Sequence, residues 1–363
     1  MSRVLAVVPA LPPHVYPQEQ ITEVIGPLLA GPRAQARLRA LHRSAGVRTR
    51  HLALPLEEYA ALDGFGAAND HFIRVGTDLA ERAARAALAR AGLAPRDVDV
   101  VVLTSVTGIS APSLDALLVP RLGLRDDVRR VPSFGWGCAG GAAGLATVHD
   151  LLQGRPGGVA LLLAVELCSL TVQRGDDSVA NLVSSGLFGD GAAAVVVVGD
   201  AHPSAARAPA AMPRVLGARS RIVGGTSDQL GWRIGGTGFR IVLGAGLPDV
   251  IRTGLADDVG LLLEEHDLKV RDVGTWVVHA GGPRILDAVR DALDLDDAAL
   301  AVSRGSLADV GNLSSASVLH VLGRTLSPPS GGPAPAPGST GVLMAFGPGV
   351  GAEYVLLHWP EAA

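Results

Sequence analysis

The chain has 363 residues, 48% hydrophobic and 18% charged, which is enough to bury a large core and excludes global disorder. Its formal net charge of -4 offers no basic excess for nucleic acid. The longest apolar runs, such as residues 159–165 and 194–198, are too short to span a bilayer, and the N-terminus lacks the hydrophobic stretch of a signal peptide. We therefore expect a cytoplasmic protein with no nucleic-acid or membrane partner.

Short apolar runs typical of strands alternate along the chain with amphipathic stretches typical of helices. In the first half, we predict helices at residues 78–91 and 142–152 and strands at residues 98–103, 159–165 and 192–198. In the second half, we predict helices at residues 255–266, 283–293 and 314–324 and strands at residues 275–278, 341–346 and 353–358. Residues 327–340 are rich in Pro, Gly and Ser and predict a surface loop. The alternation indicates an α/β layer architecture of two similar halves, residues 1–205 and 206–363.

The chain contains only two cysteines, Cys138 and Cys168, which excludes a disulfide framework and a structural zinc site. Cys138 lies in the glycine-rich segment FGWGCAGGAAG, between a β-rich run and the helix predicted at 142–152. A thiol at a helix N-terminus is stabilised as a thiolate, and free backbone N–H groups nearby can stabilise an oxyanion. The segment therefore predicts an acidic, nucleophilic cysteine, whereas Cys168 is expected to be structural.

Two further polar residues stand at loop-to-helix junctions. His279 follows a predicted strand and precedes Gly-Gly-Pro, and Asn312 precedes a predicted helix, where on its own it would be an ordinary N-cap. Together with Cys138 they form a chemical set in which the thiol carries an acyl group and two donors stabilise an enolate. This chemistry requires neither a metal nor a cofactor.

Five motifs in order make the interpretation specific. They are GCAGG at 137–141, GLFGDGAA at 186–193, HAGGPRIL at 279–286, GNLSSA at 311–316 and FGPG at 346–349. The chain thereby resembles the chalcone synthase superfamily, the type III polyketide synthases. The resemblance implies a five-layered αβαβα thiolase fold, a homodimer, and acyl-CoA and malonyl-CoA as substrates without a carrier protein.

The resemblance also assigns roles to residues. It makes Cys138 the nucleophile, His279 and Asn312 the decarboxylation pair, and Phe188 the gate between tunnel and cavity. The other residues expected at the substrate cavity are Val106, Thr171, Trp232, Ser314, Phe346, Gly347 and Pro348. The coenzyme A phosphates are expected near a basic cluster, for which a solvated helix face is an equally good interpretation: Arg37, Arg39, Arg43, Arg48 and Arg50.

The cavity residues favour an aliphatic starter. Val106 and Trp232 stand where plant members usually have threonine and glycine, and Ala111 stands where they have methionine. A triketide or tetraketide pyrone or a resorcinol-type product is therefore expected. A tetrahydroxynaphthalene synthase-like reaction from malonyl-CoA alone ranks second, because such enzymes typically carry cysteines at the positions of Val106 and Thr171.

Two alternative interpretations of the function remain. A β-ketoacyl-carrier-protein synthase III shares the fold and the three polar residues, but its histidine usually lies in a different segment from the one around His279. An inactive relative that acts as a binding or scaffold protein is the alternative outside enzymes, and the intact set Cys138, His279 and Asn312 argues against it.

Overall fold

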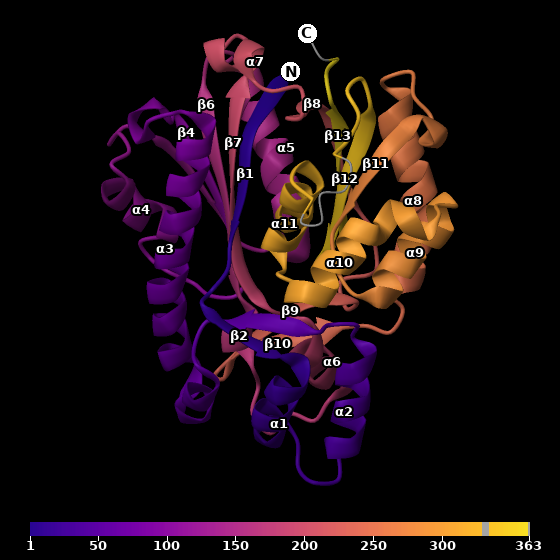
Figure 1. Ribbon diagram of the computed structural model, residues 1–363. Coiled ribbons are helices and arrows are strands. Elements are labelled where there is room, and N and C mark those ends of the chain that lie inside the picture. The colour runs from indigo at the N-terminus through magenta and orange to yellow at the C-terminus, as the bar shows by residue number, and fades with distance from the viewer. Residues whose placement is uncertain (329–333, 362–363) are drawn as a thin grey trace.

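The computed structural model describes residues 1–328 and 334–361, and a nine-stranded mixed sheet runs through it (Figure 1). The strand order is β11-β12-β13-β8-β1-β7-β6-β4-β5. The first group of strands is β1 (Ser2–Ala10), β4 (Val100–Thr104), β5 (Arg129–Ser133), β6 (Val159–Leu167) and β7 (Asp190–Gly199). The second group is β8 (Arg214–Ile222), β11 (Val273–Val278), β12 (Thr340–Gly347) and β13 (Gly351–His358).

The two groups of strands meet at a narrow seam. β1 pairs with β8 through only Ser2↔Val215 and Arg3↔Arg214, whereas β1 pairs with β7 along its whole length. The sheet is therefore continuous in its hydrogen bonds, yet its two parts can face each other across the molecule.

Helices occupy three layers around these strands (Figure 1). One outer layer covers the first group of strands and contains α3 (Gly64–Ala91) and α4 (Leu114–Leu122). The other outer layer contains α8 (Leu247–Glu264), α9 (Pro283–Leu293) and α10 (Ala301–Val310). Between the two groups of strands lie α5 (Gly140–Gln153) and α11 (Ser315–Leu326), which contact both. This is the five-layered αβαβα thiolase architecture expected from the resemblance.

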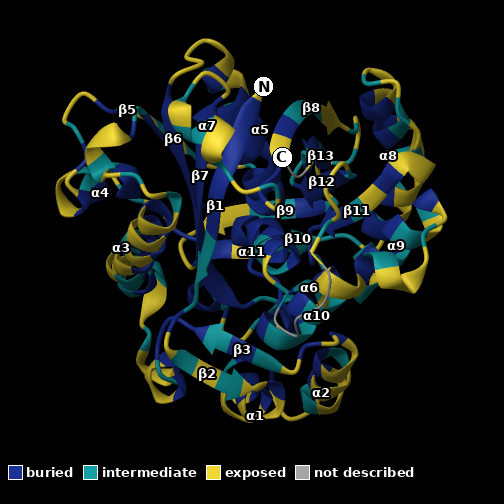
Figure 2. Cartoon of the chain, turned by 45° about the horizontal axis from the view of Figure 1, so that its top comes forward, coloured by how far each residue is buried: buried dark blue, intermediate teal, exposed yellow. Residues whose placement is uncertain are grey.

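Burial explains why these elements form. The strand β6 reads VALLLAVEL and is buried along its whole length, because β4 and β7 flank it and helices cover both of its faces. In Figure 2 the outer helix α3 carries an exposed stripe, whereas the central strands β6 and β7 are buried along their whole length. Helix α3 ends at Gly92, whose φ of 66° is the left-handed conformation that glycine adopts without strain.

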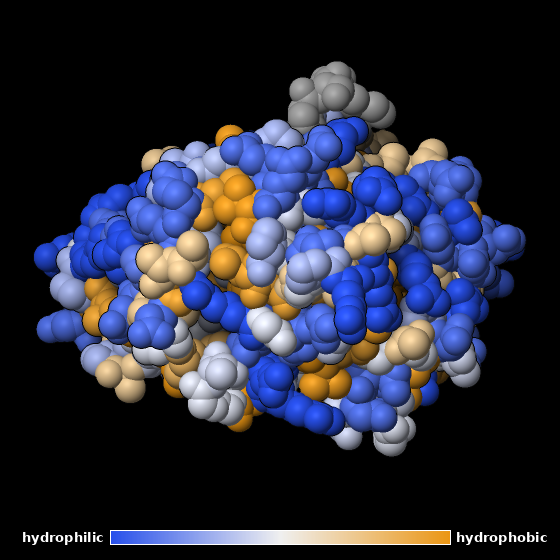
Figure 3. Space-filling model, turned by 90° about the horizontal axis from the view of Figure 1, so that it is seen from below, coloured by the Kyte–Doolittle hydropathy of each residue, from blue (hydrophilic) through white to orange (hydrophobic). Residues whose placement is uncertain are grey.

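A smaller region at the lower end of Figure 1 sits below the strand layers. It contains two small two-stranded antiparallel sheets. One pairs β2 (His14–Pro17) with β3 (Thr49–Leu52), and the other pairs β9 (Leu230–Gly235) with β10 (Gly238–Leu243). Its helices are α1 (Gln18–Leu29), α2 (Gln35–Ser44) and α6 (Val179–Leu187), and α7 (Pro203–Arg207) lies elsewhere, at the upper end. Viewed from below in Figure 3, this face is mostly hydrophilic with separated apolar spots.

Most predicted elements are confirmed, with different ends. The helix predicted at 78–91 is the last half of α3, and the helix predicted at 255–266 begins earlier, at Leu247. Residue 340 of the predicted loop belongs to β12, and residues 329–333 of that loop lie outside the described residues. Within residues 1–328 and 334–361, no helix is long and apolar enough to cross a membrane.

Candidate active site

Cys138 lies in a short 3-10 turn, Gly137–Ala139, which joins β5 to the central helix α5. Gly137 has a φ of 54°, and a side chain there would collide with the ring of Pro348 in the β12–β13 turn. Glycine is therefore required for the cysteine turn to pack against the β12–β13 hairpin. The thiol side chain is buried, with 8% of its surface exposed, so it can be reached only through a cavity.

A cavity of about 560 Å³ leads to this thiol, and we call it the outer cavity. Its wall includes Cys138, His279, Asn312, Phe188 and Phe346, which come from five separate segments of the chain. The fold thus brings together the three residues that sequence motifs placed 141 and 33 positions apart (279 − 138 and 312 − 279). The remaining wall is largely aliphatic and comes mainly from α2, α6, α8 and α9.

His279 follows the last residue of β11 and is held by its backbone, since its N–H donates to the carbonyl of Met344 (2.9 Å). Burial lowers the pKa of its imidazole to about 3, so the ring is neutral at pH 7. Its Nδ1 is buried and has no hydrogen-bond partner among the described residues. A neutral imidazole can donate one hydrogen bond to a substrate oxygen and accept a proton at its other nitrogen.

Asn312 is oriented by bonds on both sides of its amide. Its Nδ2 donates to the carbonyl of Gly281 (3.3 Å), and its Oδ1 accepts from the backbone N–H of Ser314 (2.8 Å). Ser314 has a φ of 48°, an uncommon backbone conformation for a residue with a side chain, and its Oγ lies 3.6 Å from Cys138 Sγ. The Asn312 amide therefore places an N–H group beside the cavity and fixes the hydroxyl that contacts the thiol.

The structure contradicts the acidic thiol that the sequence predicted at Cys138. Burial raises the pKa of Cys138 to about 12, the hydrogen bond with Ser314 opposes this, and the nearby Glu166 raises it further. The thiol lies in the turn before α5 rather than in its first turn, so the helix N-terminus does not offset desolvation. The Cys138 thiol and the His279 imidazole are therefore both neutral at pH 7.

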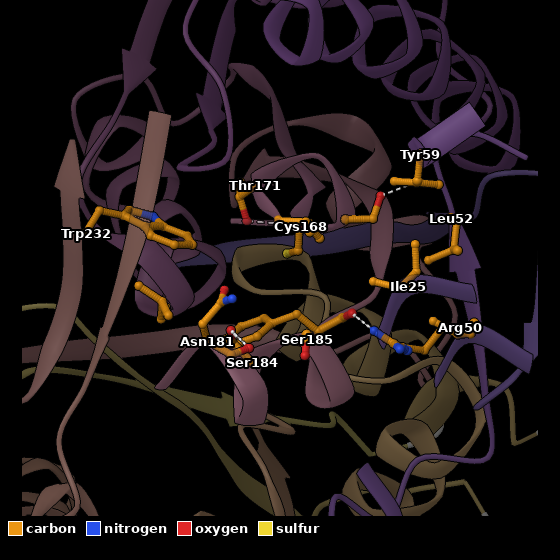
Figure 4. A pocket seen from close by; sticks show the side chains of 15 residues that line it. Ile25, Arg50, Leu52, Tyr59, Cys168, Thr171, Asn181, Ser184, Ser185 and Trp232 are labelled. Carbon is orange, nitrogen blue, oxygen red and sulfur yellow. Dashed lines mark hydrogen bonds between the residues drawn. The ribbon is translucent and has the colours of Figure 1, made fainter. Parts of the chain in front are cut away.

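Phe188 lies on the wall between two cavities. Besides the outer cavity, it lines a second one of about 40 Å³, which we call the inner cavity. Figure 4 shows that Thr171 and Trp232 face the inner cavity from one side and Arg50 from the other. Trp232 is half-buried and packs against Phe239 with ring centroids 5.8 Å apart. Thr171 and Trp232 thus line the inner cavity, and their role toward substrate stays a prediction.

Four residues expected at the cavity line neither the outer nor the inner cavity, and one of them, Ser314, contacts the thiol of Cys138 instead. Val106 is buried, and its backbone N–H donates to Glu166 (3.1 Å), while its side chain lines neither cavity. Gly347 and Pro348 pack against the cysteine turn rather than lining a cavity. A side chain on Gly347 would meet the carbonyl of Trp136, so this glycine permits close packing of two loops.

The basic cluster near the N-terminus divides into two groups. Arg37, Arg39 and Arg43 are exposed on α2, whose residues Leu41 and Ser44 border the outer cavity. Arg48 is exposed and pairs with Asp309, whereas Arg50 is buried at 3% exposure. Placing Arg50 in a solvent-facing cluster was therefore wrong. Arg284 of α9 is an exposed cation on the wall of the outer cavity that was not predicted from the sequence.

Glu166 is the other residue that the sequence analysis missed. It is fully buried at the end of β6, where it accepts from the hydroxyls of Thr107 (2.8 Å) and Ser315 (2.6 Å). Burial raises the pKa of its carboxyl to about 7, and these hydrogen bonds oppose the rise. The sequence signal was a single carboxylate in an otherwise apolar strand. Glu166 links the segment after β4 to the start of α11, directly behind Cys138 and Ser314.

Comparison with known proteins agrees with this geometry. Residues 1–201 match the model of the N-terminal domain of chalcone and stilbene synthases, and residues 215–359 match that of the C-terminal domain. The chain is 55% identical to 1,3,6,8-tetrahydroxynaphthalene synthase of Streptomyces peucetius subsp. caesius, covering 99% of this chain and 93% of the relative. It is 29% identical to the alpha-pyrone synthesis polyketide synthase-like Pks18 of Mycobacterium tuberculosis, covering 95% and 88%.

A solved structure has the same fold. The crystal structure of tetrahydroxynaphthalene synthase from Streptomyces coelicolor A3(2), a bacterial type III polyketide synthase, superposes with a TM-score of 0.90 at 33% identity, covering 99% of this chain and 100% of that one. The layered fold and the buried thiol beside an imidazole and an amide define an acyl-transferring condensing enzyme. More particularly, the chain belongs to the chalcone and stilbene synthase family and is a type III polyketide synthase of bacterial type. Such enzymes use coenzyme A thioesters without a carrier protein.

Proposed function

We propose that Cys138 carries the growing acyl chain as a thioester, with His279 and Asn312 as donors to substrate oxygens. The observation that carries this proposal is the shared outer cavity, because all three side chains line it at one site. His279 is neutral and Asn312 holds its amide beside the cavity, so each can donate a hydrogen bond without a change of charge.

The reaction follows from these roles. Cys138 Sγ attacks the carbonyl of an acyl-CoA while its proton passes to His279, and the coenzyme A thiolate leaves and recovers that proton. Malonyl-CoA then enters the same cavity and loses carbon dioxide, and the enolate oxygen accepts hydrogen bonds from His279 and Asn312. The enolate carbon forms a bond to the acyl carbonyl carbon, and Cys138 leaves as a thiolate that reacquires the chain for the next extension.

The preferred substrate is malonyl-CoA as both starter and extender, giving a tetrahydroxynaphthalene. The relative that is 55% identical is named a tetrahydroxynaphthalene synthase. We give this similarity more weight than the presence of Val106 and Thr171 at positions where such enzymes typically have cysteines.

An aliphatic starter with closure to a pyrone is the second candidate. The wall of the outer cavity favours it, because aliphatic side chains such as Val183, Leu243 and Ile251 line that cavity. The similarity to Pks18 points in the same direction.

One product experiment distinguishes these candidates. The enzyme is incubated with malonyl-CoA alone and with malonyl-CoA plus acyl-CoAs of graded length, and products are identified by mass spectrometry. A tetrahydroxynaphthalene from malonyl-CoA alone supports the first candidate. Pyrones that appear only when an acyl-CoA is added support the second and reject the first.

We further infer a cytoplasmic homodimer that binds coenzyme A near α2 and α9. Phe134 and Ile109, about half exposed, supply apolar surface that a second copy can cover. Arg43 of α2 and Arg284 of α9 offer cations to phosphates at the outer cavity. A reducing compartment would keep the free thiol of Cys138 available. Light scattering on the purified protein tests the dimer.

A further inference from the structure

The inner cavity is small but has a polar lining. A volume of about 40 Å³ holds a small group rather than a complete polyketide. Its polar lining includes Arg50, Tyr59, Ser169, Thr171, Asn181, Ser184 and Ser185 (Figure 4). A ligand oxygen entering this cavity needs a hydrogen-bond donor that is not already paired within the protein.

The hydroxyls on the side of Tyr59 already donate within the protein. Ser169 donates to the carboxylate of Asp190, so its oxygen is the acceptor for the hydroxyl of Tyr59. Thr171 donates to the carbonyl of Cys168 (2.8 Å). None of these hydroxyls has a proton left for a ligand.

The hydroxyl of Ser185 is paired through a buried imidazole. Burial and the nearby Arg50 lower the pKa of His42 to about 4, so its ring is neutral at pH 7. Ser185 Oγ lies 3.0 Å from His42 Nε2 and 2.9 Å from the carbonyl of Leu182, so its proton has an acceptor in either tautomer of the ring.

The amide and hydroxyl of α6 are likewise paired. Asn181 uses both N–H groups, on the carbonyls of Gln173 (3.0 Å) and Asp176 (2.7 Å). Ser184 donates to the carbonyl of Asn181 (3.0 Å). The hydroxyl and side-chain amide donors of the polar lining therefore already have acceptors within the protein.

Arg50 differs from these groups. Its Nε donates to Gln18 Oε1 (2.9 Å) and its Nη1 to the carbonyl of Phe188 (2.8 Å). Its Nη2 has no acceptor among residues 1–328 and 334–361, although the side chain is 97% buried. Burial lowers the pKa of the guanidinium to about 10, which leaves it charged at pH 7. Figure 4 shows the guanidinium directed toward the inner cavity.

We propose that Arg50 Nη2 binds a carbonyl or enolate oxygen of the polyketide chain once its far end has passed Phe188. This inference rests on the proposed condensation at Cys138. A polyketide carries an oxygen on alternate carbons, whereas an alkyl chain offers none, so a buried cationic donor favours the polyketide. The same guanidinium holds the backbone of Phe188, so the gate and the oxygen-binding group are fixed to each other.

The test compares Arg50→Lys with Gln18→Met. The lysine keeps the charge and removes Nη2, whereas Gln18→Met removes the acceptor of Arg50 Nε and leaves Nη2 in place. Acyl loading of Cys138, melting temperature and the ratio of full-length to shorter products from malonyl-CoA are measured. We expect Arg50→Lys to load normally and to lower that ratio about tenfold, as loss of a charged hydrogen bond does. Gln18→Met should keep the wild-type ratio even with a lower melting temperature.

Equal product ratios in the two variants would overturn the proposal, because they would indicate a purely structural arginine. A second measurement does not depend on folding of the Arg50 variant. The Cys138→Ala protein is titrated with hexanoyl-CoA and 5-oxohexanoyl-CoA, which differ by one carbonyl oxygen. Tighter binding of the oxo compound supports the proposal, and equal binding rejects it. A wild-type protein that makes no product from malonyl-CoA would instead count against the proposed starter, which the binding comparison does not require.

Discussion

Phe188 and Asn312 lie side by side as an isolated parallel β-bridge. The N–H of Asn312 donates to the carbonyl of Leu187 (2.9 Å), and the N–H of Gly189 donates to the carbonyl of Asn312 (3.0 Å). The aromatic ring between the two cavities and the amide beside Cys138 are therefore attached to one short piece of paired backbone. A displacement of either residue's backbone would move the other.

Phe188→Ala should merge the inner and outer cavities without disturbing this bridge, because the bridge uses backbone atoms only. We expect bulkier acyl-CoA starters to gain in kcat/KM relative to small ones. The loss of stability should fall below the ~3–5 kcal/mol typical of a fully buried phenylalanine, since Phe188 is only half-buried. Steady-state kinetics with graded starters and a thermal melt measure both effects. An unchanged starter preference would contradict the gate role.

Cys138→Ala should abolish covalent acylation, because the only other cysteine, Cys168, contributes to the inner cavity instead. Some decarboxylation of malonyl-CoA should survive, since His279 and Asn312 keep their positions. Intact-protein mass spectrometry after incubation with an acyl-CoA reads the acylation. Cys168→Ala is the matched control and should still be acylated; an acyl adduct on Cys138→Ala would refute the assigned nucleophile.

The Cys138 thiol should react only slowly with alkylating reagents at neutral pH. With the pKa of Cys138 raised to about 12 by burial, the thiolate fraction grows throughout the accessible alkaline range. In a Cys168→Ala background, the rate of iodoacetamide inactivation should therefore keep rising with pH beyond the ordinary thiol pKa of 9.0. A plateau reached below pH 8 would restore the thiolate–imidazolium pair predicted from the sequence.

Glu166 should make stability depend on pH in an unusual direction. Its pKa is about 7 in the folded protein against an ordinary value of 4.5, so the unfolded chain loses this proton first as pH rises. The stability contributed by protonated Glu166 is complete below pH 4.5 and is lost as pH rises through about 7. The loss is on the order of 3 kcal/mol. Denaturant unfolding of wild type and Glu166→Gln across this range measures it, and parallel curves would contradict the shifted carboxyl.

The sequence predicted the layers and the three central residues because both leave local signals. Glycine-rich turns and strand ends mark Cys138, His279 and Asn312, and apolar strands mark the sheet. Glu166 and Arg50 could not be placed, because their partners lie far away in the chain: Ser315 binds the first and Phe188 the second. Local periodicity does not reveal such burial. The division of the chain at residue 205 and the roles of individual site residues stay predictions.

The first half of α3 shows a different limit. Residues 64–71 read GFGAANDH, a glycine- and asparagine-containing stretch with weak intrinsic helix propensity, yet they form the start of a 28-residue helix. Tertiary packing stabilises this start, since Ala68 and Phe72 are buried in the core on that side of the sheet. Propensity alone therefore placed the beginning of the helix too late.

Trp232 offers the sharpest test of the inner cavity, because the chain contains a matched control. Trp232 is half-buried and lines that cavity, whereas Trp276 of β11 is buried in the core at 6% exposure and lines neither cavity. Trp232→Ala should enlarge the inner cavity beyond its present volume of about 40 Å³. We expect longer chains or bulkier starters and only a modest fall in melting temperature, because part of the indole faces solvent.

Trp276→Ala should instead leave the product profile unchanged and lower the free energy of unfolding by about 3–5 kcal/mol, as large core deletions do. Product mass spectrometry and thermal melts of the two variants are compared under identical conditions. If Trp232→Ala left the products unchanged and fell in melting temperature as far as Trp276→Ala, the indole of Trp232 would be a packing group. Different products at near-normal stability would instead assign to Trp232 a limit on chain length, since its side chain and Thr171 line the space into which the chain would grow.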